Sequence, residues 1–134
     1  SSNSEMAKNL FLLGHFLSKD RYISMAKQML MNVEQDVQRN IYFYANWGML
    51  QALFTSPLYE VVILGDDCNN KRQQFDQHYL PNVILMGGKT EGSLALLKQK
   101  LIPGQTTIYV CHNKSCDLPV TEVQQALQQI VRAG

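Results

Sequence analysis

Two cysteines near the carboxyl end of the chain have the spacing and setting for sulfur chemistry. Cys111 and Cys116 are five residues apart, in a polar stretch that follows a short apolar run. This spacing differs from the three-residue offset of a thioredoxin-type motif. A bend at Asn113 would bring the two Cα atoms within the roughly 4.4–6.8 Å that a disulfide needs. The pair is therefore a redox candidate, and the alternative is two small buried hydrophobic residues.

The same cysteines, together with Cys68 and His112, form a candidate metal set. Thiolate and imidazole are the ligands that zinc prefers, and a structural zinc site uses four ligands at once. The loops after two different apolar runs would have to meet at one point to assemble them. The sequence indicates no cofactor.

Two other apolar runs also end in polar residues. Lys89 and Thr90 belong to a Gly-Gly-Lys-Thr stretch, but the first glycine of a phosphate loop is replaced by Val83. They are kept as candidates for binding phosphate or a nucleotide. Asp66 and Asp67 are candidates for a Mg²⁺ or acid/base site. Capping of the next helix by one of them is the favoured interpretation.

The spacing of apolar residues predicts the elements that would position these side chains. Residues recurring every three or four positions predict helices, and short unbroken apolar runs predict buried parallel strands. Helices are expected at 4–18, 21–39, 44–55, 69–79, 91–101 and 121–132, and strands at 61–64, 82–86 and 107–110. The fold class is thus α/β: a helical hairpin and a third helix, followed by a small three-stranded parallel sheet with flanking helices.

This order of elements gives one expectation about the site. The carboxyl ends of parallel strands meet at one edge of a sheet, where ligands gather. We therefore expect Asp66, Lys89, Thr90 and the two cysteines of the pair to share that edge. A helical segment at 1–57 and a β-α segment at 58–134 are expected to form one compact unit.

Ser4 and Asp20 are the predicted N-caps of the first two helices. Apolar residues recur at helical spacing in the first helix, at Met6, Leu10, Leu13 and Leu17. The second helix carries a Met-rich stripe that we expect to be core, with an adaptable binding groove as the alternative; it consists of Tyr22, Met25, Met29, Val33 and Val37. In the fourth helix, Phe75 and Tyr79 are expected to point inward.

Composition excludes several classes of function. The net charge of the 134-residue chain is +1, so there is no electrostatic signature for nucleic acid or an anionic membrane. No apolar run approaches the roughly 20 residues that cross a bilayer. An odd count of three cysteines favours a reducing compartment, and we expect a cytoplasmic location. The Ser-Ser-Asn-Ser start suggests a piece of a longer protein.

Three stretches resemble one known family. Tyr109–Val120 is similar to the carboxyl-terminal end of the YyaL-type thioredoxin-domain proteins, which reads roughly Tyr-Val-Cys-x-Asn-x-x-Cys-x-x-Pro-Val. Tyr59–Asp66 resembles the strand that follows the last helices of that family, and Ser2–Leu10 resembles a helix start. The likeness runs in the same order along nearly the whole chain.

The resemblance implies a larger parent protein. Members of the family carry a thioredoxin-like domain and then an (α/α) toroid of the six-hairpin glycosidase type, like that of N-acylglucosamine 2-epimerases. The first three helices here would be the end of the toroid, followed by its closing α/β segment. Four residues match the family pattern: Cys111, Asn113, Cys116 and Pro119. The resemblance also implies that Asn3 and Asn9 lie near the pocket end of the toroid.

Three hypotheses for function follow. The first is a non-catalytic carboxyl-terminal module whose partner is the rest of its parent chain. In the second, the cysteine pair exchanges electrons with the thioredoxin-like domain of an enzyme that acts on a sugar-like substrate. The third is a phosphate or nucleotide binder at the carboxyl edge of the sheet. We expect the fragment alone to be non-catalytic, and exposed apolar helices to favour a homodimer.

Overall fold

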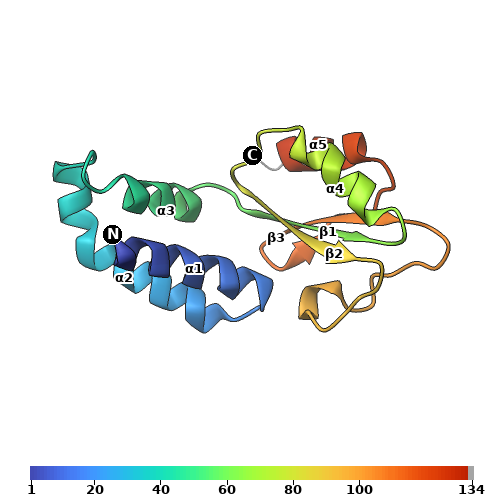
Figure 1. Ribbon diagram of the computed structural model, residues 1–134, viewed down its shortest axis with the longest axis horizontal. Helices are drawn as coiled ribbons and strands as arrows, with labels where there is room; N and C mark the ends of the chain where they lie inside the picture. Colours follow the sequence, from blue (N-terminus) through green and yellow to red (C-terminus); the bar gives the residue numbers. More distant parts are fainter. Residues whose placement is uncertain (133–134) are drawn as a thin grey trace. The chain divides into compact units, whose positions relative to one another are not determined.

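The computed structural model describes residues 1–132, which divide into two compact units. The first unit is Ser1–Ser56 and the second begins at Pro57. Within the described residues there are five α-helices and a four-stranded mixed sheet. The chain is therefore a mixed α/β protein (Figure 1). No helix in this part of the chain has both the length and the apolar character needed to cross a membrane.

The first unit consists of α1 (Ser2–Phe16), α2 (Asp20–Arg39) and α3 (Ala45–Thr55). The short turn after α1 sends α2 back alongside it (Figure 1). Gly14 permits this close packing, because a Cβ atom there would lie 2.5 Å from Ile23 Cγ1. The helical hairpin predicted from the spacing of apolar residues is thus present.

Both predicted N-caps of this unit are displaced by one or more positions. Ser1 caps α1, and its hydroxyl accepts from the Ser4 backbone N–H in a reciprocal capping box. Ser4 is therefore the N3 residue of that box, and its hydroxyl donates to Ser1 O at 2.7 Å. Lys19 is the N-cap of α2, so Asp20 lies in the first turn, where its charge suits the helix dipole.

The buried face of α1 is formed by small residues and one aromatic ring. Ala7, Phe11 and Gly14 are buried, and the Phe11 ring packs edge-to-face on Phe54 of α3, 4.8 Å between centroids. In contrast, Met6, Leu13 and Leu17 of the same helical spacing are all exposed, with Met6 at 55%. The stripe of α2 that was expected to be core is so only in part, because Val37 is buried and Met25 is 44% exposed.

The second unit is built on β1 (Tyr59–Leu64), β2 (Val83–Gly88), β3 (Thr107–His112) and the short β4 (Ser115–Cys116). Their order across the sheet is β2-β1-β3-β4. β1 and β2 are parallel, as predicted, but β3 is antiparallel to β1. The prediction of three parallel strands is therefore wrong for β3, which runs in the opposite direction.

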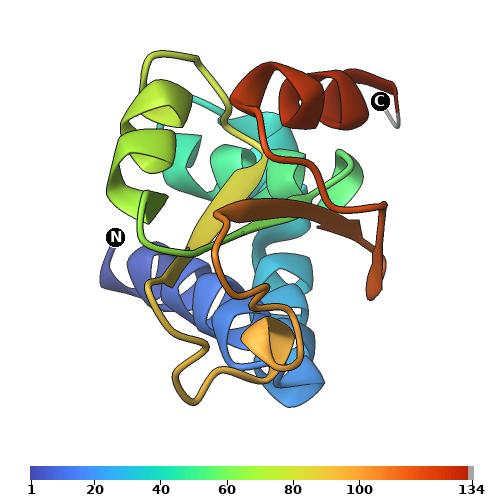
Figure 2. The same cartoon turned by 90° about the vertical axis from the view of Figure 1, so that its right-hand side faces the viewer.

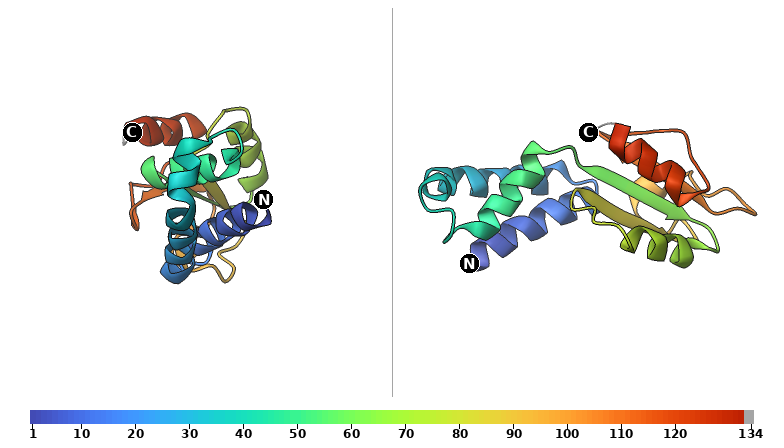
Figure 3. Two further views of the ribbon diagram at one scale, coloured as in Figure 1. Left: turned by 90° about the vertical axis from the view of Figure 1, so that its left-hand side faces the viewer. Right: turned by 90° about the horizontal axis from the view of Figure 1, so that it is seen from above.

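Two helices cover one face of this sheet. α4 (Cys68–Asp76) and α5 (Val123–Arg132) pack beside each other above the strands (Figures 2 and 3). Their buried side chains join those of β1 and β3 in a single core that includes Val61, Phe75 and Ile108. Tyr79 lies beyond the end of α4 and is 91% exposed, so its predicted inward position is wrong.

The other face is covered by the connection between β2 and β3. A helix was predicted at 91–101, but only the 3-10 turn η1 (Ala95–Leu97) forms. Tertiary hydrogen bonds replace the helical ones: Tyr109 Oη donates to Lys100 O at 2.7 Å, and Glu91 Oε2 accepts from the backbone N–H groups of Lys100 and Leu101 at 2.7 and 2.9 Å. Donation from Leu101 and then Lys100 lowers the pKa of the Glu91 carboxyl.

Candidate functional site

The reversed direction of β3 separates the residues that were expected at one edge. Asp66 and the Lys89–Thr90 pair follow the carboxyl ends of the parallel strands β1 and β2. Cys111 instead pairs with Glu60 at the amino end of β1. The cysteine pair therefore lies at the opposite edge of the sheet from Asp66 and Lys89.

The four candidate zinc ligands are not brought together. Cys68 lies on α4 and belongs to the core under the two helices. Cys111 lies on the opposite face, since Val110 belongs to that core and successive strand residues point to opposite faces. Within residues 1–132, no three His, Cys, Asp or Glu side chains cluster closely enough to hold a metal ion.

Cys111 and Cys116 form a disulfide that closes the β3–β4 hairpin. Asn113 and Lys114 both adopt positive φ (49° and 62°), as a two-residue type I′ turn requires, and asparagine is one of the residues that tolerates this conformation. The turn places the two cysteines directly opposite each other, with Cα atoms 3.9 Å apart. Asn113, a predicted ligand-binding residue, thus has a structural position at the tip of the turn.

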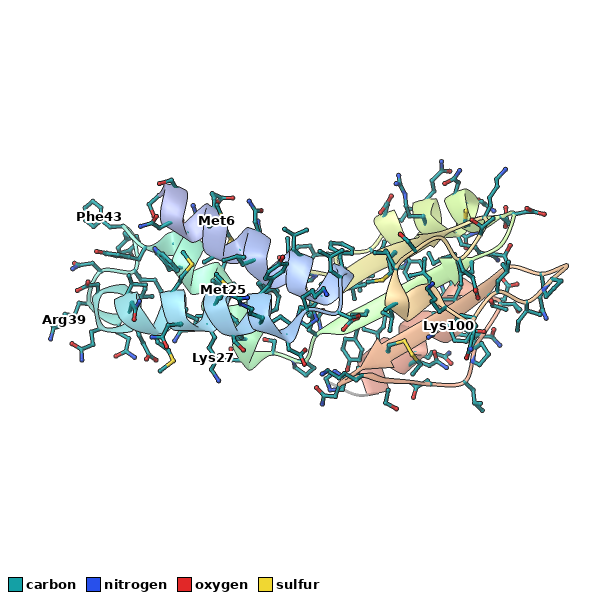
Figure 4. The ribbon with its side chains drawn as sticks, turned by 90° about the horizontal axis from the view of Figure 1, so that it is seen from below. Met6, Met25, Lys27, Arg39, Phe43 and Lys100 are labelled. Carbon is teal, nitrogen blue, oxygen red and sulfur yellow. A yellow bond between two sulfur atoms is a disulfide. The ribbon has the colours of Figure 1, made fainter. Side chains whose placement is uncertain are left out.

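The two sulfur-bearing residues differ in accessibility. Cys111 is only 2% exposed, while Cys116 is half-buried at the edge of the sheet. Lys100 lies near this face, with its Nζ 5.9 Å from the centroid of the Tyr109 ring. Figure 4 shows the disulfide and Lys100 from this side of the sheet. Any thiol partner would therefore reach Cys116 before Cys111.

His112 turns to the opposite face and contacts Tyr59. The rings are 5.2 Å apart between centroids, and Nδ1 of His112 lies 2.9 Å from Leu58 O. The Tyr59 hydroxyl is buried and has no hydrogen-bond partner among the described residues. Burial, and then the negative charge of Asp117, raises the pKa of Tyr59. His112 is therefore part of the packing at the amino end of β1.

A small cleft of about 240 Å³ opens beside α4 at the carboxyl ends of β1 and β2. Its lining includes Cys68, Arg72, Gly87 and Gly88, but not Asp66, Lys89 or Thr90. Glycine is required at position 87, since its φ is 152° and a Cβ atom would overlap the Ile63 carbonyl oxygen.

Asp67 is the N-cap of α4, but its side chain does not cap the backbone. Its carboxylate instead accepts from Asn70 Nδ2 at 3.2 Å, and its own backbone N–H donates to Thr106 Oγ1 at 3.0 Å. The expectation that one aspartate side chain caps this helix is therefore not met by Asp67.

Asn3 and Asn9 are both exposed on α1. They are six positions apart, which on a helix of 3.6 residues per turn places them on different faces. Neither lines the clefts described here. The structure thus does not gather these two predicted ligand-binding residues into one site.

The larger cavity lies in the first unit and was not predicted. It has a volume of about 710 Å³ and is formed by the start of α1, the α2–α3 connection and the first turn of α3. Its aromatic lining comes from Tyr42, Phe43, Tyr44 and Trp47. The sequence signal was available, because four aromatic residues fall between positions 42 and 47 at a helix–helix junction.

Comparisons with known proteins give no family. No family model matches the chain, and neither a curated protein nor a solved structure matches it.

Proposed function

We propose that this chain is a non-catalytic module whose helical unit packs against further helices of a larger protein. The observation that carries this proposal is the apolar stripe of α1, which we define as Met6, Leu13 and Leu17 and which is exposed along its length. A second observation is the resemblance of Ser2–Leu10 to a helix start in proteins with an (α/α) toroid.

The stripe is the second apolar face of one helix. α1 already buries Ala7, Phe11 and Gly14 in its own unit. The members of the stripe lie beside this buried face and are separated from one another by seven and then four residues. A helix that is apolar around much of its circumference is typical of one with neighbours on two sides. Burying a Leu or Met side chain contributes about 1.5–3 kcal/mol, so covering the stripe would stabilise the assembly substantially. The occupant that we propose is a pair of antiparallel helices from the preceding part of a toroid.

The test is a Leu13→Gln variant measured with and without the preceding helices of the parent protein. We expect little change in the free energy of unfolding of the chain alone, because Leu13 is exposed there. In the parent, the same variant should lower that free energy by about 1–3 kcal/mol. Leu118→Gln, at an exposed leucine of the other unit, is the matched control. An equal effect of Leu13→Gln in both contexts would refute the packing proposal.

A second candidate function, thiol–disulfide exchange, is favoured by the Cys111–Cys116 disulfide. In a cytoplasmic protein, disulfides are usually transient and serve catalysis or redox sensing. A thiolate of a dithiol reductant would attack Cys116 Sγ, and the disulfide would break as Cys111 leaves as a thiolate and takes up a proton. The second thiol of the reductant would then release Cys116. The pair gains two electrons and two protons, and the reductant becomes a disulfide.

Single variants test which sulfur is reactive. With Cys68 replaced by Ala as background, Cys116 in a Cys111→Ala variant should react with an aromatic disulfide reagent at least about tenfold faster than Cys111 in a Cys116→Ala variant. The reason is that Cys111 is buried and Cys116 is partly accessible. Equal rates, or a disulfide that a dithiol such as dithiothreitol does not reduce in the folded protein, would remove this candidate.

A further inference from the structure

The outer edge of β2 has backbone groups that no other strand pairs with. β2 is the end strand in the order β2-β1-β3-β4. At one end of its ladder with β1, Tyr59 N–H donates to Asn82 O at 2.9 Å, and at the other end Gly65 N–H donates to Gly88 O at 3.0 Å. Even-numbered residues of β2 therefore direct their backbone groups at β1. Leu85 directs its N–H and C=O outward, where no described residue pairs with them.

This edge also lacks the features by which natural strands avoid pairing with another chain. Such edges are commonly very short, or carry a charge, a proline or a bulge. β4, at the other end of the sheet, has only two residues. β2 has six, with no charged residue and no proline among them, and its register with β1 is unbroken. An extended segment could therefore add to β2 through main-chain hydrogen bonds.

The cleft of about 240 Å³ lies beside the same edge. α4 lies beyond β2 rather than directly over it (Figures 3 and 4). Leu85 and Gly87 line the cleft from the strand, and Arg72 lines it from the helix. The Leu85 side chain packs on the core under α4 and α5. Directly opposed residues of an antiparallel pair share one face, so a residue added opposite Leu85 would direct its side chain into this cleft.

The charge of the cleft selects the second side chain of such a segment. Arg72 is the charged residue among the described residues that line it. Its pair with Asp76 spans 3.6 Å, and the Arg72 side chain is 63% exposed, so this pair is weak and can be exchanged for another. A residue two positions before the one opposite Leu85 would lie opposite Gly87, where no side chain obstructs it.

We infer that the outer edge of β2 binds an extended peptide segment of another protein. The segment runs antiparallel to β2, with an apolar residue opposite Leu85 and an acidic residue two positions earlier. The inference uses only residues of the second unit, so it is independent of the packing proposed for the α1 stripe. A Leu13→Gln variant should therefore bind peptide with unchanged affinity.

Four capped peptides test the inference, acetyl-Thr-Glu-Thr-X-Thr-Ser-amide with Val, Ile, Leu or Phe at X. NMR titration of the isotope-labelled chain should give a dissociation constant of about 0.1 mM for at least one of them. In the free chain, the Leu85 amide should exchange with solvent faster than that of Met86, which faces β1. Saturating peptide should slow exchange at Leu85 at least about tenfold. Absence of saturable binding below about 1 mM for all four peptides would overturn the inference.

A matched pair of modified peptides tests the backbone pairing. Methylation of the backbone nitrogen of X removes the donor to Leu85 O and should weaken binding at least about tenfold. The same methylation of the threonine after X falls on a nitrogen that points away from β2, and should change the affinity little. Equal losses would show that the peptide does not pair with the strand, and would overturn the inference.

A matched pair of protein variants tests the charge. Arg72→Glu should raise the dissociation constant about three- to tenfold and should favour a peptide with Lys in place of Glu. Arg39→Glu makes the same change of charge at an exposed arginine of the other unit and should have little effect. Equal effects of the two variants would overturn the inference. So would a Leu85 amide that is already protected in a chain found dimeric by light scattering, because a second copy would then occupy the edge.

Discussion

Reduction of the Cys111–Cys116 bond should destabilise the second unit by a small and calculable amount. The bond joins directly opposed residues of β3 and β4 and closes a loop with a sequence separation of 5. A disulfide stabilises mainly by restricting the unfolded chain, and the effect grows with the logarithm of loop length. A short hairpin therefore gains less than a long loop would.

The magnitude follows from the loop length. For a loop of about five residues, the chain-entropy relation gives roughly 7 cal/mol/K, or about 2 kcal/mol at 25 °C. The hairpin also has support that survives reduction. The turn at Asn113 and Lys114 keeps its backbone geometry, and the Asp117 N–H donates to Val110 O at 2.9 Å. We therefore expect the reduced protein to remain folded and to lose about 2 kcal/mol.

Urea unfolding with and without dithiothreitol measures this loss. With a slope of about 2 kcal/mol per molar urea, the midpoint should fall by about 1 M. Far-UV circular dichroism reports both units, whereas Trp47 emission reports the helical unit, since Trp47 lies on α3. The two signals recorded on one sample separate the response of each unit.

A double variant, Cys111→Ala with Cys116→Ala, is the control for the reductant. Dithiothreitol should not change its midpoint, because its remaining cysteine, Cys68, is a free buried thiol. A loss above about 4 kcal/mol in the wild type would show that the bond maintains the native sheet rather than restricting the unfolded chain. No loss at all in a sample that the reductant has fully reduced would show that the bond does not stabilise the unit by restricting the unfolded chain, and either result would refute the reasoning.

Three further predictions concern single side chains of the second unit. Tyr59→Phe removes a buried hydroxyl that has no hydrogen-bond partner among the described residues. The free energy of unfolding in urea should therefore stay the same or rise by up to about 1 kcal/mol. A clear decrease would contradict this prediction. The pKa of the Glu91 carboxyl is lowered from its ordinary value of 4.5. The ionised carboxylate therefore stabilises the fold above pH 4.5, and this contribution is lost as the pH falls through the lowered pKa. Hydrogen exchange at the Leu101 amide should accelerate over that interval, and an exchange rate that follows only the intrinsic pH dependence would contradict the role of the carboxylate. Gly87→Ala should cost at least about 2 kcal/mol in urea unfolding, because it combines positive φ with a backbone overlap. Gly104→Ala, at a positive φ with nothing within 4 Å, should cost less, and equal losses would show that the overlap is relieved.

Most of the secondary structure could be read from local spacing. α2 and α3 begin within a residue or so of their predicted starts, and the three predicted strands are all present. The exception is residues 91–101, where Leu94, Leu97 and Leu101 have helical spacing but only η1 forms. The Glu91 carboxylate and the Tyr109 hydroxyl bind the backbone of this segment instead. These partners are nine residues away along the chain, beyond the three- and four-residue spacing on which the helix prediction rests, so local spacing alone predicted the wrong structure.

The unbroken apolar runs were interpreted correctly as buried strands but not as parallel ones. Val61–Leu64 is buried on both faces because α4 and α5 cover one side and the 89–106 connection covers the other. An antiparallel strand in such a sheet has the same composition as a parallel one, since the run reports burial and not direction. The expectation that all candidate residues share one edge required the three strands to run in the same direction. It is wrong because β3 runs antiparallel to β1.

The sequence by itself determined where most of the helices and the three long strands lie, and that Cys111 and Cys116 are close enough along the chain to pair around a turn. These features depend on side-chain periodicity and on short loops, which are local properties. Only the tertiary structure decided the direction of β3, the face on which each cysteine lies, and the joining of the α2–α3 connection with the start of α1 around the larger cavity. Those outcomes depend on contacts between residues far apart in sequence, whose free energies no local pattern records.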